Sequence, residues 1–312
     1  MANFKEELEQ KLNDRHLSEG TIKLYIRNLE KLNDGQLLSF KFLNNIDKII
    51  EKISKYKDNT KKSVLISIVS LLGCCPDDKK LVKLRKKYYD LMINKSNEIK
   101  ENETDEPTDE QKANWISWED VKSKFQELKL EVDKFKDNKR LSDNESDILL
   151  MYFLLSLYIY NPPRRNKDYQ FMNVVKKYND TMDDDINYLS YDDDKFIFNN
   201  YKTSKKYGKQ TIDIKPEQKE CINLYLKFHP KILGKISKNT NTPLLVIDGH
   251  PLVQVNSMTK ILNKIFGKRI SSSALRHIFL SDKYKEITKD MKIDAEMMAH
   301  SVGQQKDYIK NT

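Results

Sequence analysis

The chain lacks several features that would narrow its class at once. Its 312 residues contain no apolar run near the roughly 20 residues that a membrane-spanning helix needs. The first residues, MANFKEELEQ, have no apolar core of the kind found in secretory signal peptides. Only three cysteines are present, Cys74, Cys75 and Cys221; their spacing matches no zinc site, and adjacent cysteines rarely form a disulfide. These absences predict an intracellular protein with reduced, structural cysteines.

Arginine is also scarce. Eight of the 56 basic residues are arginines, and Lys, Asn and Ile are used heavily throughout, as an AT-rich genome would produce. The net charge of +9 is therefore weak support for nucleic-acid binding by itself. Arginine, unlike lysine, can hold a phosphate through two parallel hydrogen bonds. The positions of the arginines are thus more informative than the total charge.

Charge divides the chain into two basic parts separated by an acidic connector. Residues 1–100 carry a net charge of +7, residues 101–112 a net charge of −5, and the remainder +7. The connector, NEIKENETDEPTDEQK at residues 97–112, has almost no apolar residues and a run of like charges, which predicts an exposed linker. The predicted organisation is a helical, DNA-binding domain at 1–96, the linker, and a second domain at 113–312.

Hydrophobic periodicity predicts a mainly α-helical protein with a small antiparallel β-sheet. Apolar residues recur at helical spacing in SEGTIKLYIRNLEKLN and in several later segments. The stretch SDILLMYFLLSLYIY, residues 146–160, is apolar on nearly all sides, which predicts a buried core helix. Farther along, the pattern changes to short β-prone runs at 188–191, 196–201 and 210–214, separated by turn-forming residues. The sheet is therefore expected inside the second, otherwise helical domain.

Several polar residues stand where they could hold or transform a ligand. Arg164 and Arg165 directly follow NPP after the buried segment, and Arg276 lies in SSSALRH within an otherwise apolar helix. A buried guanidinium needs an anionic partner, which a phosphate or a protein carboxylate can supply. Taken alone, Arg276 is more commonly explained by an ion pair with Asp or Glu. Three further candidates, taken alone, have ordinary explanations as solvated or packing residues: Lys202, His300 and Tyr308.

The order and spacing of these residues give them a different meaning. An arginine pair after a buried helix, a lysine in a β-hairpin, ALRH some 110 residues beyond the arginines, AHS about 24 residues later and a tyrosine eight residues farther on form one series. This series resembles the catalytic domain of the tyrosine recombinases. SALRHIF resembles the family's H-x-L-R-H segment, MAHSVGQQKDY its L-G-H-x(7–8)-Y segment, and KTS the lysine of its hairpin. The helical domain, linker and mixed domain fit the family's core-binding and catalytic halves, so the resemblance spans nearly the whole chain.

The resemblance assigns roles to five residues. It implies that Arg165 and Arg276 clamp the phosphate, that His300 takes the family's histidine-or-tryptophan position, that Tyr308 is the nucleophile, and that Lys202 is the general acid. The residue types suit this chemistry. A phenol with a pKa of about 10 attacks a phosphodiester poorly unless cations neutralise the charge that builds on the nonbridging oxygens. The leaving hydroxyl also needs a proton from a general acid.

Four neighbouring residues complete the assignment. Asp168 stands where the family commonly has an acidic residue that braces the site, and Arg164 is the weaker alternative to Arg165 as the first phosphate-binding arginine. His277 matches a family residue with a mainly structural role. Ser273 departs from the pattern, because the family usually has His or Lys three residues before the second arginine. This departure leaves open which group accepts the tyrosine proton.

The resemblance therefore implies a site-specific DNA recombinase or integrase of a virus or mobile element. Such an enzyme acts without ATP, metal or cofactor. It would join DNA to Tyr308 as a 3′-phosphotyrosine and release a 5′-hydroxyl. Its implied partners are double-stranded DNA with specific target sites and further copies of itself, as a dimer on one site and a tetramer in synapsis, with no membrane. Two alternatives stay open: a type IB topoisomerase that works as a monomer, and a DNA-binding protein of the same fold that does not cleave.

Overall fold

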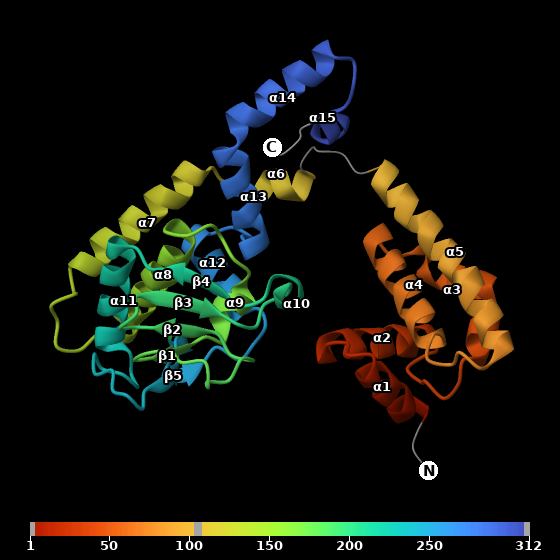
Figure 1. Cartoon of the computed structure of the whole chain (residues 1–312), viewed down its shortest axis with the longest axis horizontal. Helices are drawn as coiled ribbons and strands as arrows, with labels where there is room; N and C mark the ends of the chain where they lie inside the picture. The colour runs from red at the N-terminus through yellow and green to blue at the C-terminus, as the bar shows by residue number, and fades with distance from the viewer. Residues whose placement is uncertain (1–3, 103–107, 309–312) are drawn as a thin grey trace. The chain divides into compact units, whose positions relative to one another are not determined.

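The chain folds into two compact units, Met1–Pro107 and Thr108–Thr312, each described here by itself. The computed structural model describes residues 4–102 and 108–308, without the side chains of residues 306 and 307. Helices predominate in both units, as predicted (Figure 1). No helix within the described ranges is long and apolar enough to cross a membrane.

The first unit is all-helical in its described part. Apolar residues at helical spacing, among them Ile22, Ile26 and Leu29, are buried in its core, and Ser18 caps the helix that carries them. Tyr88 is also fully buried, and its hydroxyl donates a hydrogen bond to a backbone carbonyl. The elements are α1 Phe4–Asp14, α2 Glu19–Leu32, the 3-10 helix η1 Lys41–Asn44, α3 Ile46–Ser54, α4 Asp58–Leu72 and α5 Lys79–Glu101.

Much of the segment predicted as an exposed linker is helical. Helix α5 continues to Glu101, and a short helix, α6, spans Asp109–Asn114 and begins with a capping box. The acidic residues that suggested a linker thus stand in part at a helix N-terminus, where negative charge is favourable. Helix α6 belongs to the second unit, and its last residue is bound within that unit, because the Arg269 backbone N–H donates to Asn114 Oδ1 at 2.9 Å. The middle of the predicted linker, residues 103–107, lies outside the described residues.

The second unit combines helices with a small sheet. The predicted buried helix is α8, whose central residues are almost all inaccessible, and a capping box formed by Ser117 and Asp120 opens α7. The remaining helices are α7 Trp118–Asp133, α8 Asp143–Ile159, α9 Asn166–Gln170, α10 Ser204–Tyr207, α11 Pro216–Phe228, α12 Ser257–Phe266, α13 Ser272–Lys283, α14 Lys285–Met297 and α15 Val302–Tyr308.

The sheet is mixed, so the prediction of an antiparallel sheet is wrong for one strand pair. Five strands lie in the order β4-β3-β2-β1-β5, and β1 runs parallel to β2 while the other pairs are antiparallel. A parallel pair needs a long crossover, and the connection at residues 176–187 supplies it. The strands are β1 Asn173–Val175, β2 Tyr188–Ser190, β3 Lys195–Phe198, β4 Gln210–Asp213 and β5 Asn241–Pro243; a separate pair is β6 Val246–Ile247 with β7 His250–Pro251.

Both faces of the central strands are covered. Val174, Leu189 and Phe196 point into the main core with α8, α11 and α12, whereas their strand neighbours, such as Tyr188 and Ile197, face a second small cluster. The crossover between β1 and β2 covers that second face through three partly buried side chains, Tyr178, Met182 and Ile186. The alternation of faces along each strand follows from the two-residue period of β structure. Helix α9, which directly precedes β1, is held in place by this core.

Candidate active site

The arginine pair lies where α8 ends and α9 begins. Two prolines follow α8, and because proline has no backbone N–H and restricts the residue before it, the helix cannot continue through them. Arg165 is the N-cap residue of α9 in extended conformation, and no side-chain bond caps the helix there. Its side chain is half-buried and makes no hydrogen bond or ion pair within the described residues. The Arg165 guanidinium is therefore available to a ligand.

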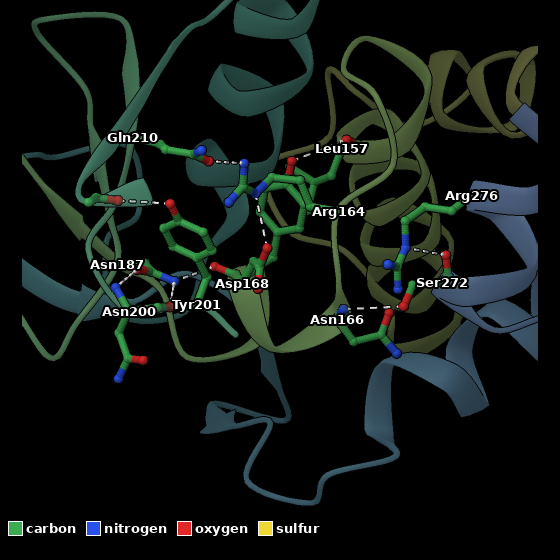
Figure 2. A network of polar contacts seen from close by, with 12 residues as sticks. Leu157, Arg164, Asn166, Asp168, Asn187, Asn200, Tyr201, Gln210, Ser272 and Arg276 are labelled. Atoms are coloured by element: carbon green, nitrogen blue, oxygen red, sulfur yellow. Dashed lines mark hydrogen bonds and ion pairs between the residues drawn. The ribbon is translucent and has the colours of Figure 1, made fainter. Parts of the chain in front are cut away.

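Asn166 joins the start of α9 to two distant helices. Its backbone N–H donates to Ser272 Oγ at 3.3 Å, on the first turn of α13, and its side-chain amide donates to Thr259 Oγ1 at 2.9 Å on α12. The buried Tyr158 hydroxyl of α8 donates to Asn166 Oδ1 at 2.8 Å. Figure 2 shows this junction, with Asn166 and Ser272 meeting beside Arg276. These bonds bring the two arginine motifs, far apart in the sequence, to one place.

Arg276 lies on α13, and its side chain binds two serines in the turn before it. Its Nε donates to the Ser272 carbonyl at 3.3 Å and its Nη2 to Ser273 Oγ at 3.2 Å, and the side chain is half-buried. Burial first, and then the positive charge of Arg165, lower the pKa of the Arg276 guanidinium. No described carboxylate forms an ion pair with either arginine. The common explanation of Arg276 by an ion pair with Asp or Glu therefore does not hold for the described residues. Arg165 and Arg276 lie near enough to repel, and the charge of Asp168 offsets the effect of Arg165 on the pKa of Arg276 only in part.

Asp168 is the acidic residue nearest to this pair, but it binds the other arginine. Its carboxyl group is buried, and its Oδ2 accepts from Arg164 Nε at 3.0 Å. The second oxygen, Oδ1, has no hydrogen-bond partner in the described part of the chain. Burial raises the pKa of Asp168, and the charges of Arg164 and Arg165 lower it only in part. Asp168 thus acts on the electrostatics of both arginines while pairing with Arg164.

Lys202 lies in the connection between β3 and β4, as the hairpin prediction requires. The two strands pair in antiparallel register, and the connection includes the short helix α10. The Lys202 side chain is exposed and makes no hydrogen bond or ion pair with any described residue. Its neighbours Lys205 and Lys206, in α10, are exposed too. A general acid at this position would have to reach the phosphate from solvent.

His300 and Tyr308 form a pair of their own. Their rings stack with centroids 5.8 Å apart and planes at 24°. Neither His300 ring nitrogen has a hydrogen-bond partner among described residues, although both are shielded from solvent, and the Tyr308 side chain is 74% exposed. Ala299, just before, has a positive φ of 54°, which turns the chain between α14 and α15.

The structure does not bring this pair to the arginines. Helix α15 folds back against α14, and Figure 1 shows it well separated from α9, which follows Arg165. The sequence-predicted residues thus fall into three places: Arg164, Arg165, Asp168, Arg276 and Ser273 at the junction of α9 and α13; Lys202 on the β3–β4 connection; and His300 with Tyr308 at α15. His277 points to solvent from α13.

Sequence reasoning missed the residues that join these segments. Asn166 and Ser272 hold the arginine motifs together, and Gln210 binds Arg164 from β4, its Oε1 accepting from Arg164 Nη1 at 2.9 Å. The signal that could have found them is a polar residue close to each arginine: Asn166 directly follows Arg165, and Ser272 is part of SSSALRH. Gln210 gave none, because a glutamine at the start of an exposed strand is ordinary.

Comparison with family models, with curated proteins and with solved structures finds no match to this chain. Two half-buried guanidinium groups that form no ion pair with a described carboxylate can together bind one anion through two of its oxygens, as a phosphodiester offers. The exposed phenol of Tyr308 on α15 and the shielded imidazole of His300, just before α15, lie apart from the arginines.

Proposed function

We propose that this chain cuts and rejoins DNA strands as a site-specific recombinase or integrase of the tyrosine recombinase type. The observation that carries the proposal is the pairing of Arg165 with Arg276, held by the bond from Asn166 to Ser272. Placing two guanidinium groups near each other costs electrostatic free energy, which a bound anion offsets. A phosphodiester fits, since it offers two nonbridging oxygens to two guanidinium groups.

The proposed step forms one bond and breaks one. The Tyr308 oxygen gives up its proton to water or to a base of the site and attacks phosphorus, the bond from phosphorus to the 5′ oxygen breaks, and the protein is left joined to the 3′ phosphate. Lys202 gives a proton to the departing 5′ oxygen, and the arginines stabilise the charge on the nonbridging oxygens. Strand joining is the reverse, so the bond energy is kept in the ester and no ATP is needed.

This mechanism requires a rearrangement of α15. Tyr308 must reach a phosphate held by Arg165 and Arg276, which calls for a different placement of α14 and α15 from that in Figure 1, or for the arginines of a second copy. Tyr308 is exposed, and the ring contact that it makes among the described residues is with His300, so such a movement would have few side-chain contacts of Tyr308 to break. Binding of DNA is the event expected to drive it.

The separation of Tyr308 from the arginines favours a second candidate, a DNA-binding protein that keeps the fold without cleaving. One experiment separates the candidates. The protein is incubated with a pool of nicked duplexes of randomised sequence, and complexes that survive detergent are recovered and sequenced. A recombinase yields a covalent adduct with an enriched sequence; a binder yields enrichment on native gels but no adduct. Relaxation of supercoiled plasmid by the monomer, with no joined two-site product, would instead indicate type IB topoisomerase activity.

A further inference from the structure

Among the described arginines of the site, Arg164 is the one whose guanidinium binds both a carboxylate and an amide of the protein. Its Nε donates to Asp168 Oδ2 at 3.0 Å and its Nη1 to Gln210 Oε1 at 2.9 Å. Its planar group lies over the Phe198 ring, with the central carbon 3.8 Å from the centroid. The side chain is only 15% exposed. Arginine can make these contacts at once because its rigid fork donates in the plane while its face stacks on aromatic rings.

These contacts reach both ends of the connection that carries Lys202. Phe198 is the last residue of β3 and Gln210 the first of β4, so Arg164 touches the chain just before and just after residues 199–209. The Tyr201 ring also lies beneath the guanidinium, at 5.1 Å, and its hydroxyl donates to the Gly208 carbonyl at 2.8 Å, which closes the connection on itself. Figure 2 shows Arg164 between Gln210, Tyr201 and Asp168.

We propose that Arg164 is a positioning residue. It holds the β3–β4 connection, which carries Lys202, in a fixed place relative to the arginine clamp, that is, Arg165 and Arg276. Arg164 and Arg165 are adjacent in the chain, one bound to the β3–β4 connection and the other facing Arg276. Arg165 of the clamp is thus joined by one peptide bond to Arg164, and Arg164 contacts Tyr201, the residue before Lys202. This proposal rests on the proposed function, and it gives Arg164 no direct contact with the phosphate, because its Nε and Nη1 are bound to Asp168 and Gln210 and its face stacks on Phe198.

The proposal gives Arg164 a chemical consequence that ordinary packing would not have. If the connection is released, Lys202 spends less time near the departing 5′ oxygen, and only the step that needs its proton slows. Phosphate binding by Arg165 and Arg276 stays intact. A 5′-bridging sulfur leaves as a thiolate without a proton, so a substrate with this atom separates the two effects.

The first test needs no DNA. Backbone N–H groups of the connection are hydrogen-bonded within it, including those of Ser204, Lys206, Tyr207 and Gly208. In the full-length Arg164→Lys protein, which keeps the charge but loses the fork, hydrogen exchange at these amides should speed up about tenfold or more, as expected for loss of local protection. The matched control is Arg140→Lys, because Arg140 is an exposed arginine of the same unit that forms no hydrogen bond or ion pair with a described residue; this variant should exchange like wild type.

The second test uses a duplex recovered from the randomised pool, in ordinary and 5′-thio form. Arg164→Lys should cleave the ordinary duplex ~10- to 100-fold more slowly than wild type, the range that misplacement of a catalytic group produces. On the thio duplex it should cleave within about threefold of wild type. Gln210→Leu, which removes the acceptor from β4 but leaves Asp168 paired, should repeat the pattern, and Gln210→Glu should restore both rates.

Each outcome decides the proposal. Unchanged hydrogen exchange in Arg164→Lys and Gln210→Leu would overturn the proposal, because the protection of the connection would then not depend on the contacts of Arg164. Equal slowing on both duplexes would overturn it too and make Arg164 a phosphate ligand. If Arg164→Lys does not fold, the Gln210 variants give the same two readouts. Failure of the wild-type protein to form any adduct would remove the proposed function and with it the role of Lys202, whereas the exchange result would still report whether Arg164 holds the connection.

Discussion

Removing the Arg164 guanidinium should destabilise the second unit by about 3 kcal/mol, which is the lower part of the ~3–5 kcal/mol range for breaking a buried ion pair. In Arg164→Met the stem still packs, but Asp168 Oδ2 loses its donor at 3.0 Å while Oδ1 already has no partner among the described residues. Asp168 is 3% exposed, so water cannot replace the lost donor. The side chain of Arg164 itself is 15% exposed, which keeps the loss below the maximum.

Urea denaturation followed by tryptophan fluorescence measures this loss. Both tryptophans, Trp115 and Trp118, belong to the second unit, so the signal reports that unit alone. With an m-value of ~2–3 kcal/mol/M, a loss of about 3 kcal/mol lowers the midpoint by ~1–1.5 M. The control is Asp147→Asn, which breaks the exposed pair of Asp147 with Lys264 and should cost less than ~1 kcal/mol.

The loss should also depend on pH, with a sign that follows from Asp168. Burial raises the pKa of Asp168 in the folded protein, so its contribution to stability is present at low pH and is lost as the pH rises through the folded pKa. Without Arg164 the folded pKa rises further. The difference between wild type and Arg164→Met should therefore grow from ~pH 4 to ~pH 7. A difference that is constant over this range, or smaller than ~1 kcal/mol at ~pH 7, would refute the account of this pair as a buried charge interaction.

Three further predictions concern chemistry and organisation. Lys202→Ala should slow cleavage of ordinary DNA severely and be largely rescued by the 5′-bridging sulfur; rescue of Lys205→Ala or Lys206→Ala instead would move the general acid along the connection. Ser273→His should keep or raise the cleavage rate, because an imidazole can take the proton and still neighbour Arg276; a dead variant would mean that the site depends on the serine. Limited proteolysis should cut first within residues 97–112, whose sequence is polar and acidic, and both fragments should bind DNA with an affinity that falls steeply with salt; first cleavage within 120–200, or flat salt dependence, would contradict the domain division.

The sequence was most informative where one periodic signal decided the structure. The uninterrupted apolar run of α8 could only be buried, and the structure buries it. The pattern from Ser117 to Asp120 is typical of a helix start, and α7 begins there. The short strands β1 and β5 could not be predicted, because they form by pairing with each other and, for β1, with β2, and these partners lie far away in the chain. The parallel pairing of β1 with β2 depends on the long connection at residues 176–187, and local sequence patterns do not show which way a connection returns the chain.

For the site, the sequence indicated which arginines matter but not how they divide the work. Arg164 and Arg165 are chemically identical neighbours, and only their contacts show that one is bound by Asp168 and Gln210 while the other is open to a ligand. The placement of Tyr308 could not be predicted either. Its helix is short and joined to α14 through a turn at Ala299, so its position depends on weak local contacts rather than on a hydrophobic core.

The most direct test of the central claim is the identity of the residue that carries DNA. On a suicide duplex taken from the selected pool, the wild-type protein should form a detergent-stable adduct, and peptide mapping should place the DNA on Tyr308. Tyr308→Phe should bind the same duplex with a loss of at most ~1–2 kcal/mol, the worth of one hydrogen bond, and form no adduct. Tyr284→Phe, a control at the end of α13, should react normally, and Arg276→Ala should react ~100-fold or more slowly. An adduct formed by Tyr308→Phe, or one that maps to Tyr284 or another tyrosine, would contradict the account.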